Sequence, residues 1–221
     1  MDFDYAHRDT SVVEKSSYTE PFNKISLPDG LESIIESAHG REIPVSDRET
    51  LTFLSALVSA LKPRRILEIG TAVGVSAAAM LCACANAHIT TVERDAAFSE
   101  EARQNFIKLN MSSQIELIEG DAGQVIEELT GPYDFIFLDG AKAQYVKYLP
   151  RLKSLLEVGG VLLADDVLLF GYVTGETQTP KKRKMLVEHL KEYIAAVTAD
   201  PDFITAILNT GNGLAMSVKK V

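Results

Sequence analysis

The sequence predicts an α/β fold in which a seven-stranded, mostly parallel sheet ends in an antiparallel C-terminal hairpin and carries helices on both faces. Two observations predict it. From residue 64 onward, short apolar runs rich in β-branched residues alternate with stretches of helical periodicity, which is typical of parallel strands joined by crossover helices. The last two strands instead flank a Gly-Asn-Gly turn at 211–213, which is a hairpin signal.

The stretch before the sheet predicts two helices. We assign residues 1–45 to an N-terminal helical lid or dimer arm, in which apolar residues recur at helical spacing over 31–38 and Gly40 ends the helix. The second helix is expected to begin at a capping box. In that box Ser46 caps the helix and Glu49 reaches back to the cap.

The strands and the crossover helices follow in order along the chain. Strands are predicted in RRILEIG (64–70), HITTVER (88–94), IELIEGD (115–121), YDFIFLDG (133–140) and GGVLLADD (159–166), then in FITAILNT (203–210) and GLAMSVKK (213–220). Helices are predicted at about 74–86, 96–110, 122–129, 143–156 and 180–197.

Length and composition predict one domain over residues 1–221, since 46% of the 221 residues are apolar and can form one substantial core. The net charge of −9 argues against a general grip on nucleic-acid phosphates but leaves room for a local basic patch. The polar start is unlike a signal peptide, and no apolar run approaches the ~20 residues that span a bilayer. We therefore expect a cytoplasmic protein in which Cys82 and Cys84 are buried, unpaired thiols.

The first strand leads into a glycine loop, and ligands of open α/β sheets bind beyond such carboxyl ends. Gly70 permits a tight turn there, while Gly74 lets the next helix pack closely. The loop GTAVG lacks the three-glycine dinucleotide fingerprint and the lysine of a phosphate-binding loop. Because Glu68 would repel a pyrophosphate, the loop favours a cationic ligand.

Acidic residues also end the second and third strands. Glu93 lies where an acid that binds ribose hydroxyls is expected, and Asp121 with the amide of Ala122 could meet an adenine edge. Each acid alone could equally be a solvated strand end. Three of them at successive strand ends favour a nucleotide-like ligand.

Three more carboxylates end the fourth and fifth strands. Asp139 ends one strand, and Asp165 and Asp166 end the next, so they should converge because neighbouring strands lie about 4.8 Å apart. A hard divalent cation would relieve their repulsion, and Mg²⁺ fits best, with Mn²⁺ or Ca²⁺ as alternatives. The other interpretation is that an aspartate caps the next segment and Lys142 pairs with a carboxylate.

Five segments together resemble the metal-dependent O-methyltransferases, the family of catechol and caffeoyl-CoA O-methyltransferases and their bacterial relatives. These segments are LEIGTAVGVS, TTVERD, IEGDA, FIFLDGAK and LLADDVLLFG, and the resemblance runs from about Ile43 to the end of the chain. It implies the Rossmann-like fold of class I methyltransferases, which also finish a parallel sheet with an antiparallel hairpin. It further implies a homodimer.

The resemblance also implies roles for individual residues. Asp139, Asp165 and Asp166 fall on the metal ligands, although better-known family members carry asparagine at the position of Asp166. Lys142 falls on the catalytic lysine that accepts the hydroxyl proton. The methyl donor S-adenosylmethionine, which leaves as S-adenosylhomocysteine, would be contacted by Val45, Glu68, Gly70, Thr71, Ser76, Glu93, Asp121, Ala122 and Asp139.

Two classes of methyl acceptor fit such a site. One is a small catechol-like phenol, and the other is 5-hydroxyuridine at the wobble position of transfer RNA, whose adjacent oxygens could chelate the metal as a catechol does. Some bacterial relatives are transfer-RNA methyltransferases, and DDVLLFGYV, the basic run Lys181-Lys182-Arg183-Lys184 and GNGLAMS resemble that branch. The basic run could also be a solvated helix start.

Two other function classes are disfavoured. A regulatory protein that senses S-adenosylmethionine would not need the set of Asp139, Lys142, Asp165 and Asp166. An NAD-dependent oxidoreductase would carry a different glycine loop and would normally continue with parallel units instead of the hairpin.

Overall fold

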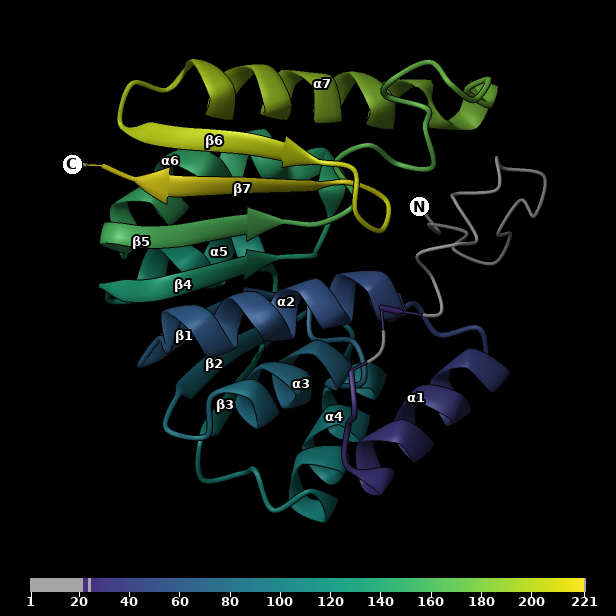
Figure 1. Ribbon diagram of the computed structural model, residues 1–221, viewed down its shortest axis with the longest axis vertical. Helices are drawn as coiled ribbons and strands as arrows, with labels where there is room; N and C mark the ends of the chain where they lie inside the picture. Colours follow the sequence, from purple (N-terminus) through teal and green to yellow (C-terminus); the bar gives the residue numbers. More distant parts are fainter. Residues whose placement is uncertain (1–21, 24, 221) are drawn as a thin grey trace.

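A computed structural model describes residues 22–23 and 25–220, so residues 1–21 and 24 of the predicted lid or arm lie outside the described residues. Seven strands form a single sheet in the order β3-β2-β1-β4-β5-β7-β6 (Figure 1). The strands are β1 (Arg65–Ile69), β2 (His88–Glu93), β3 (Ile115–Glu119), β4 (Tyr133–Leu138), β5 (Leu156–Ala164), β6 (Phe203–Leu208) and β7 (Leu214–Lys219). Among the strands of the described residues, only β7 runs against its neighbours, which confirms the predicted fold class and its terminal hairpin.

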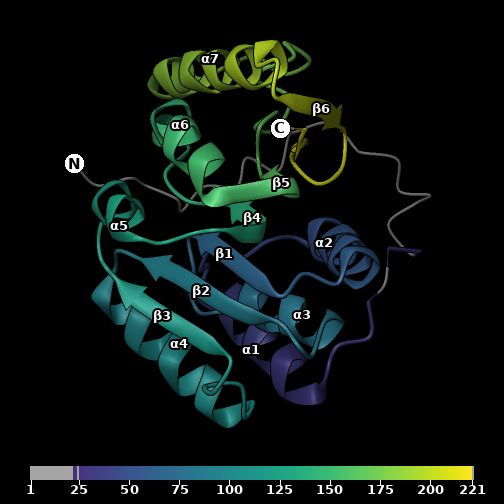
Figure 2. The ribbon, with the colours of Figure 1, turned by 90° about the vertical axis from the view of Figure 1, so that its left-hand side faces the viewer.

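Helices cover both faces of the sheet (Figure 2). On one face lie α2 (Arg48–Leu61), α3 (Val75–Ala83) and α4 (Ala96–Lys108), with α1 (Asp29–Gly40) packed outside α3. The other face carries α5 (Ala122–Glu128), α6 (Tyr145–Leu155) and α7 (Lys184–Ala199), and two short 3₁₀ turns, η1 (Lys142–Gln144) and η2 (Lys181–Arg183), precede α6 and α7. None of the helices in this described part of the chain is long and apolar enough to cross a membrane.

The central position of β4 in the sheet explains why its sequence is almost continuously apolar. Phe135 and Phe137 pack into the core beneath α2, α3 and α4. Ile136 and Leu138 point the other way, into the core beneath α5, α6 and α7. Because helices cover both faces of the sheet, these side chains are buried whichever face they point to, as in other parallel sheets.

Three local predictions were wrong. Asp47, not Ser46, caps α2: its carboxylate accepts the amide hydrogen of Thr50 at 2.8 Å, and a carboxylate is the stronger acceptor. Glu49 does not reach back to the cap, since it accepts from the amide of Gly211 at 3.2 Å.

Neither cysteine is fully buried. Cys82 is exposed where α3 ends, and Cys84 is half-buried just beyond it, with its thiol donating to the carbonyl of Pro63 at 3.5 Å. The burial of α3 covers Val75 to Leu81 and stops before either thiol. Both cysteines are unpaired, as predicted.

Candidate active site

The carboxyl ends of β1, β4 and β5 lie side by side at one edge of the sheet (Figure 1). The chain proceeds from β1 through β2 to β3 in one direction and from β4 to β5 in the other. The strand order therefore reverses between β1 and β4, and ligands of open α/β sheets bind at such a point. The predicted site residues occupy this edge.

The glycine loop after β1 needs both of its glycines. Gly70 has φ of +100°, and a Cβ there would overlap the carbonyl oxygen of Asp139. Gly74 has φ of +89°, and its Cβ would lie 2.5 Å from the ring of Phe106 on α4. The loop is thus packed between the end of β4 and the helix layer, at positions where no side chain fits.

Glu93 fastens this loop to the end of β2. One carboxylate oxygen accepts the amide hydrogen of Ala72 at 2.9 Å, and the other accepts that of Asp95 at 2.8 Å. Each oxygen keeps a second lone pair, so Glu93 can still accept hydrogen bonds from a ligand.

Glu68 is fully buried beneath the loop. Its oxygens accept hydrogen bonds from Ser76 Oγ at 2.5 Å and from Thr91 Oγ1 at 2.5 Å. The hydroxyl of Thr91 also lies 2.5 Å from that of Thr71. Burial raises the pKa of Glu68 to about 8, in spite of the two hydrogen bonds that favour its charged form.

The third strand end lies beside the second. The amide of Gly120 donates to the carbonyl of Glu93 at 2.8 Å, and Asp121 caps α5 by accepting from the amide of Gly123 at 2.9 Å. Asp121 is exposed, so the geometry also agrees with the alternative expectation for it, a solvated strand end. Ala122 is the first residue of α5 and is half-buried.

The segment before α2 reaches the end of β4. Val45 is half-buried against the core that α1 and α3 share. Its neighbour Ser46 donates from Oγ to Asp139 Oδ2 at 3.4 Å. The predicted contact residue Val45 is therefore adjacent in sequence to a residue that touches the carboxylate cluster.

Lys142 lies between two of the three predicted metal ligands. Its Nζ is 3.2 Å from Asp139 Oδ1 and 2.8 Å from Asp166 Oδ2, and the lysine side chain is 10% exposed. Burial raises the pKa of Asp139 to about 6, while the charge of Lys142 opposes that rise. A positive charge is thus already held where these two carboxylates meet.

Asp165 lies behind this pair and is 3% exposed. Its Oδ1 accepts the amide hydrogen of Asp166 at 2.6 Å, and Asp166 itself has a left-handed φ of 58°. Burial, with the charges of Asp166 and Asp139, holds the pKa of Asp165 well above its ordinary value. Among the described residues, no group of three His, Cys, Asp or Glu side chains is already arranged to hold a metal, so these carboxylates would have to move to bind one.

The donor set nevertheless fits a hard divalent cation. All three acids supply oxygen, the charges of Asp139 and Asp166 repel that of Asp165, and the buried Asp165 accepts a hydrogen bond from the backbone amide of Asp166. A cation that joined Asp139, Asp165 and Asp166 would compensate charge that Lys142 only partly compensates.

Sequence reasoning missed three residues of this site. Ser46 touches Asp139, Thr91 holds Glu68, and the buried hydroxyl of Tyr145 lies 3.0 Å from the carbonyl of Leu138 and 3.3 Å from that of Asp165. A signal existed for Thr91, a polar residue at a buried strand position, and for Tyr145, which follows Lys142 by three residues. Nothing in the sequence marks Ser46 as more than a helix cap.

The basic run lies at the same edge of the sheet. Lys181, Lys182 and Lys184 are exposed at the start of α7, which packs against η1, the turn that carries Lys142. In Figure 1 the arrowheads of β4 and β5 point toward the end of the molecule where α7 begins.

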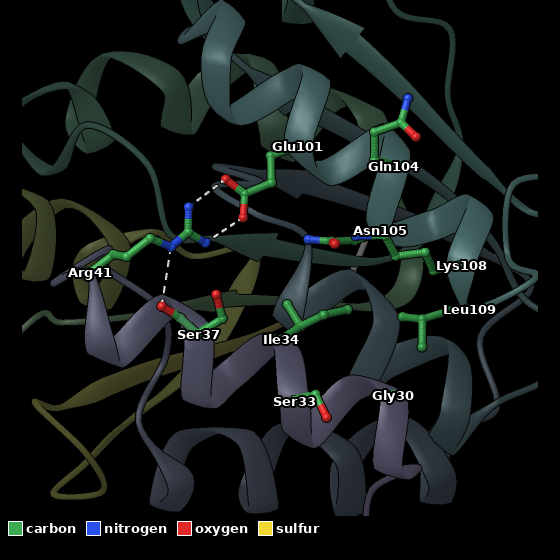
Figure 3. Close-up of a pocket in the computed structure, with 10 residues that line it drawn as sticks. All are labelled: Gly30, Ser33, Ile34, Ser37, Arg41, Glu101, Gln104, Asn105, Lys108 and Leu109. Atoms are coloured by element: carbon green, nitrogen blue, oxygen red, sulfur yellow. Dashed lines mark hydrogen bonds and ion pairs between the residues drawn. The ribbon is translucent and has the colours of Figure 1, made fainter.

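A separate hollow of about 770 Å³ lies between α1 and α4 (Figure 3) and contains none of the predicted site residues. Two of its charged residues are paired with each other: Arg41 donates to Glu101 at 2.9 Å, and it also donates to the carbonyl of Ser37 at 3.2 Å. Asn105 donates to the carbonyl of Val73 at 2.9 Å. The contact between Arg41 and Glu101 joins the end of α1 to α4, and the hollow is not the candidate site.

Comparison with known proteins places the whole described chain in one group. A family model described as O-methyltransferase matches residues 14–220. Caffeoyl-CoA O-methyltransferase of Populus kitakamiensis is 24% identical over 214 residues, which is 93% of this chain and 90% of the relative. Catechol O-methyltransferase of Niastella koreensis is 33% identical over 132 residues, which is 58% of this chain and 60% of the relative.

Solved structures agree. The S-adenosylhomocysteine-bound methyltransferase PaMTH1 of Podospora anserina superposes with a TM-score of 0.84 at 25% identity, covering 96% of this chain and 99% of that one. A Staphylococcus aureus protein provisionally assigned as a caffeoyl-CoA O-methyltransferase gives 0.83 at 32% identity, covering 91% and 97%.

Proposed function

The chain belongs to the O-methyltransferase family and is an S-adenosylmethionine-dependent enzyme, and from this premise we propose that it methylates a hydroxyl group adjacent to a second oxygen with the help of Mg²⁺. The observation that carries the proposal is the position of Lys142 Nζ between Asp139 and Asp166, with Asp165 buried beside them. The proposed reaction needs both a cation and a base, and these four residues would hold the cation and supply the base.

The three carboxylates are the proposed holders of the metal. Asp139, Asp165 and Asp166 offer oxygen at the ends of two adjacent strands, which suits Mg²⁺, or Mn²⁺ or Ca²⁺ in its place. When bound, the ion supplies Lewis-acid chemistry: it orients two neighbouring acceptor oxygens and lowers the pKa of the hydroxyl to be methylated.

Lys142 is the proposed catalytic base. Its Nζ is the basic nitrogen beside the carboxylates, and at 10% exposure it is shielded from bulk water. We propose that Nζ, as the neutral amine, accepts the proton of the acceptor hydroxyl. The resulting oxyanion then attacks the donor methyl carbon in line, the carbon–sulfur bond breaks, and S-adenosylhomocysteine leaves. The protein contributes mainly by positioning the two reactants and by electrostatics.

The proposed donor contacts surround the glycine loop. The backbone at Gly70 and Thr71, with Ser76, Val45 and the carboxyl group of Asp139, borders the methionine part, and Glu68 supplies negative charge beneath it. Glu93 accepts from ribose hydroxyls through the lone pairs that its two amide contacts leave over. Asp121 and the amide of Ala122 border the adenine.

Metal binding can be tested without a known acceptor. Calorimetric titration of the metal-free protein with MgCl₂ and MnCl₂ should show one site, and Asp165→Asn should weaken it at least tenfold. Asp134→Asn is a matched control, because Asp134 accepts backbone hydrogen bonds from Arg64 and Arg65 at the opposite end of β4. Equal binding by wild type and Asp165→Asn would refute the metal assignment.

We propose 5-hydroxyuridine of transfer RNA as the acceptor. Its adjacent oxygens suit the proposed metal, and the exposed cations Lys181, Lys182 and Lys184 lie at the start of α7, the helix that packs against the turn η1 with Lys142. Such a cluster can position phosphates even on a protein whose net charge is −9.

A small catechol-like phenol is the second candidate acceptor. It is favoured by the names of the relatives, which include catechol and caffeoyl-CoA O-methyltransferases, and by the acidic net charge. Incubation with methyl-labelled donor and either hydroxyuridine-containing transfer RNA or a catechol distinguishes the two. The RNA proposal predicts label in the RNA, and loss of that label when Lys181, Lys182 and Lys184 are changed to Gln.

We also infer a homodimer from the family resemblance. Sedimentation or light scattering should give about twice the chain mass of 24.1 kDa. A monomer at micromolar concentration would refute it.

A further inference from the structure

The buried carboxyl group of Glu68 is held entirely by groups that tolerate both of its protonation states. Ser76 and Thr91 each lie 2.5 Å from one of its oxygens, and Thr91 lies 2.5 Å from the hydroxyl of Thr71. Each of these hydroxyls can donate or accept. If Glu68 loses its proton both neighbours donate to it, and if it gains one a neighbour turns and accepts.

The charged groups that act on Glu68 are acids. Asp139 faces it from the end of β4 and Glu93 from the end of β2, while the packed helix α3 contributes the neutral Ser76. Lys142 on η1 is paired with Asp139 at 3.2 Å. Burial and the two acids raise the pKa of Glu68 to about 8, so the donor-free protein keeps most of this carboxyl protonated at pH 7.

The donor and the product of the reaction differ by one charge in this region. The sulfonium of S-adenosylmethionine is permanently positive, whereas the thioether sulfur of S-adenosylhomocysteine is neutral. Charges in a buried environment interact far more strongly than in water. Both ligands carry the same α-amino group, so the sulfonium over the glycine loop is the charge by which the donor favours ionised Glu68 more than the product does.

We propose that Glu68 is a specificity-determining residue that releases its proton to solvent when S-adenosylmethionine binds and retains it when S-adenosylhomocysteine binds. The proposal rests on the donor assignment that family membership supplies. The preference for donor over product then increases with pH, which limits product inhibition in alkaline conditions.

The size of the effect follows from the titration of one group. If Glu68 is fully ionised in the donor complex, about 0.9 proton leaves per donor bound at pH 7, and donor affinity rises about fivefold between pH 7 and pH 8. Product affinity should change far less through this group.

Calorimetry on the full chain tests the proposal. Each ligand is titrated at pH 7 in two buffers of different ionisation enthalpy, and the buffer dependence gives the protons released. Glu68→Gln serves as the reference, because it removes the titrating group but leaves the ligand's own amino group to titrate as before. We expect close to one more proton released with S-adenosylmethionine by wild type than by the variant, and a clearly smaller difference with S-adenosylhomocysteine.

Equal release with both ligands, or no release by wild type, would overturn the proposal while leaving the donor assignment intact. Failure of S-adenosylmethionine to bind at all would overturn both. If Glu68→Gln does not fold, Thr91→Val replaces it: loss of one hydrogen bond to the carboxylate should move the release to higher pH. An unmoved release curve in Thr91→Val would then contradict the role of Glu68.

Discussion

Replacing Lys142 with methionine keeps most of the side-chain volume and removes its charge. In the wild-type protein the ammonium lies 3.2 Å from Asp139 and 2.8 Å from Asp166, whose side chains are 20% and 24% exposed. The variant leaves these two carboxylates facing each other without a cation.

Two magnitudes follow. Breaking a fully buried pair costs about 3–5 kcal/mol, and the partial exposure of these acids reduces the expected loss to about 1–2 kcal/mol. For a chain of this size that lowers the melting temperature by about 2–8 °C in the absence of metal. Turnover should fall by about 10²–10⁴-fold, the usual contribution of a general base.

Initial rates of S-adenosylhomocysteine formation at saturating donor, acceptor and Mg²⁺ measure the turnover, and calorimetry measures donor binding. Donor affinity should stay within about threefold of wild type, and Mg²⁺ should recover much of the lost melting temperature. Lys153→Met is the matched control, because Lys153 is paired at 2.7 Å with Asp200 and at 2.6 Å with Asp202, away from the site. Equal turnover in the two variants would remove Lys142 from the mechanism.

Three further substitutions test the supports of the site. Gly70→Ala should abolish measurable donor binding in calorimetry, because the position has φ of +100° and the new Cβ meets the carbonyl of Asp139; near-normal affinity would contradict the description of the loop. Tyr145→Phe removes a buried hydroxyl that lies between the carbonyls of Leu138 and Asp165, and should cost about 1 kcal/mol in urea unfolding and weaken Mn²⁺ binding, whereas unchanged values would show that the hydroxyl positions nothing. Glu68→Gln should have a higher melting temperature relative to wild type at pH 8.5 than at pH 5.5, measured without donor. Burial raises the pKa of Glu68 to about 8, so the wild type loses stability as the pH rises from about 4.5 to 8, whereas Gln does not titrate. A pH-independent difference in melting temperature between the two proteins would contradict this.

Much of the sheet could be predicted because its sequence rules are local. Runs such as YDFIFL are buried on both faces, so they are continuously apolar and easily found. The acids that follow them are fixed to one edge by the parallel direction of the strands, and this is why Asp139 and Asp166 are found on either side of Lys142.

The features that the sequence did not predict depend on contacts between distant segments of the chain. The spacing of Ser46 and Glu49 matches a capping box, but tertiary contacts with Asp139 and Gly211 occupy both side chains, and Asp47 becomes the cap. The periodicity of the alanine-rich helix α3 could not show that its burial would stop before Cys82, since that depends on where neighbouring layers end. The side chain of Asp165 likewise turns toward the amide of Asp166, a detail that strand order does not determine.

The measurement that tests metal-assisted methyl transfer most directly is label transfer from S-adenosylmethionine to a catechol and to hydroxyuridine-containing transfer RNA, before and after dialysis against EDTA. The arrangement of Asp139, Lys142, Asp165 and Asp166 predicts that chelation reduces incorporation to background and that added Mg²⁺ restores it. Undiminished transfer in the presence of the chelator would contradict the account.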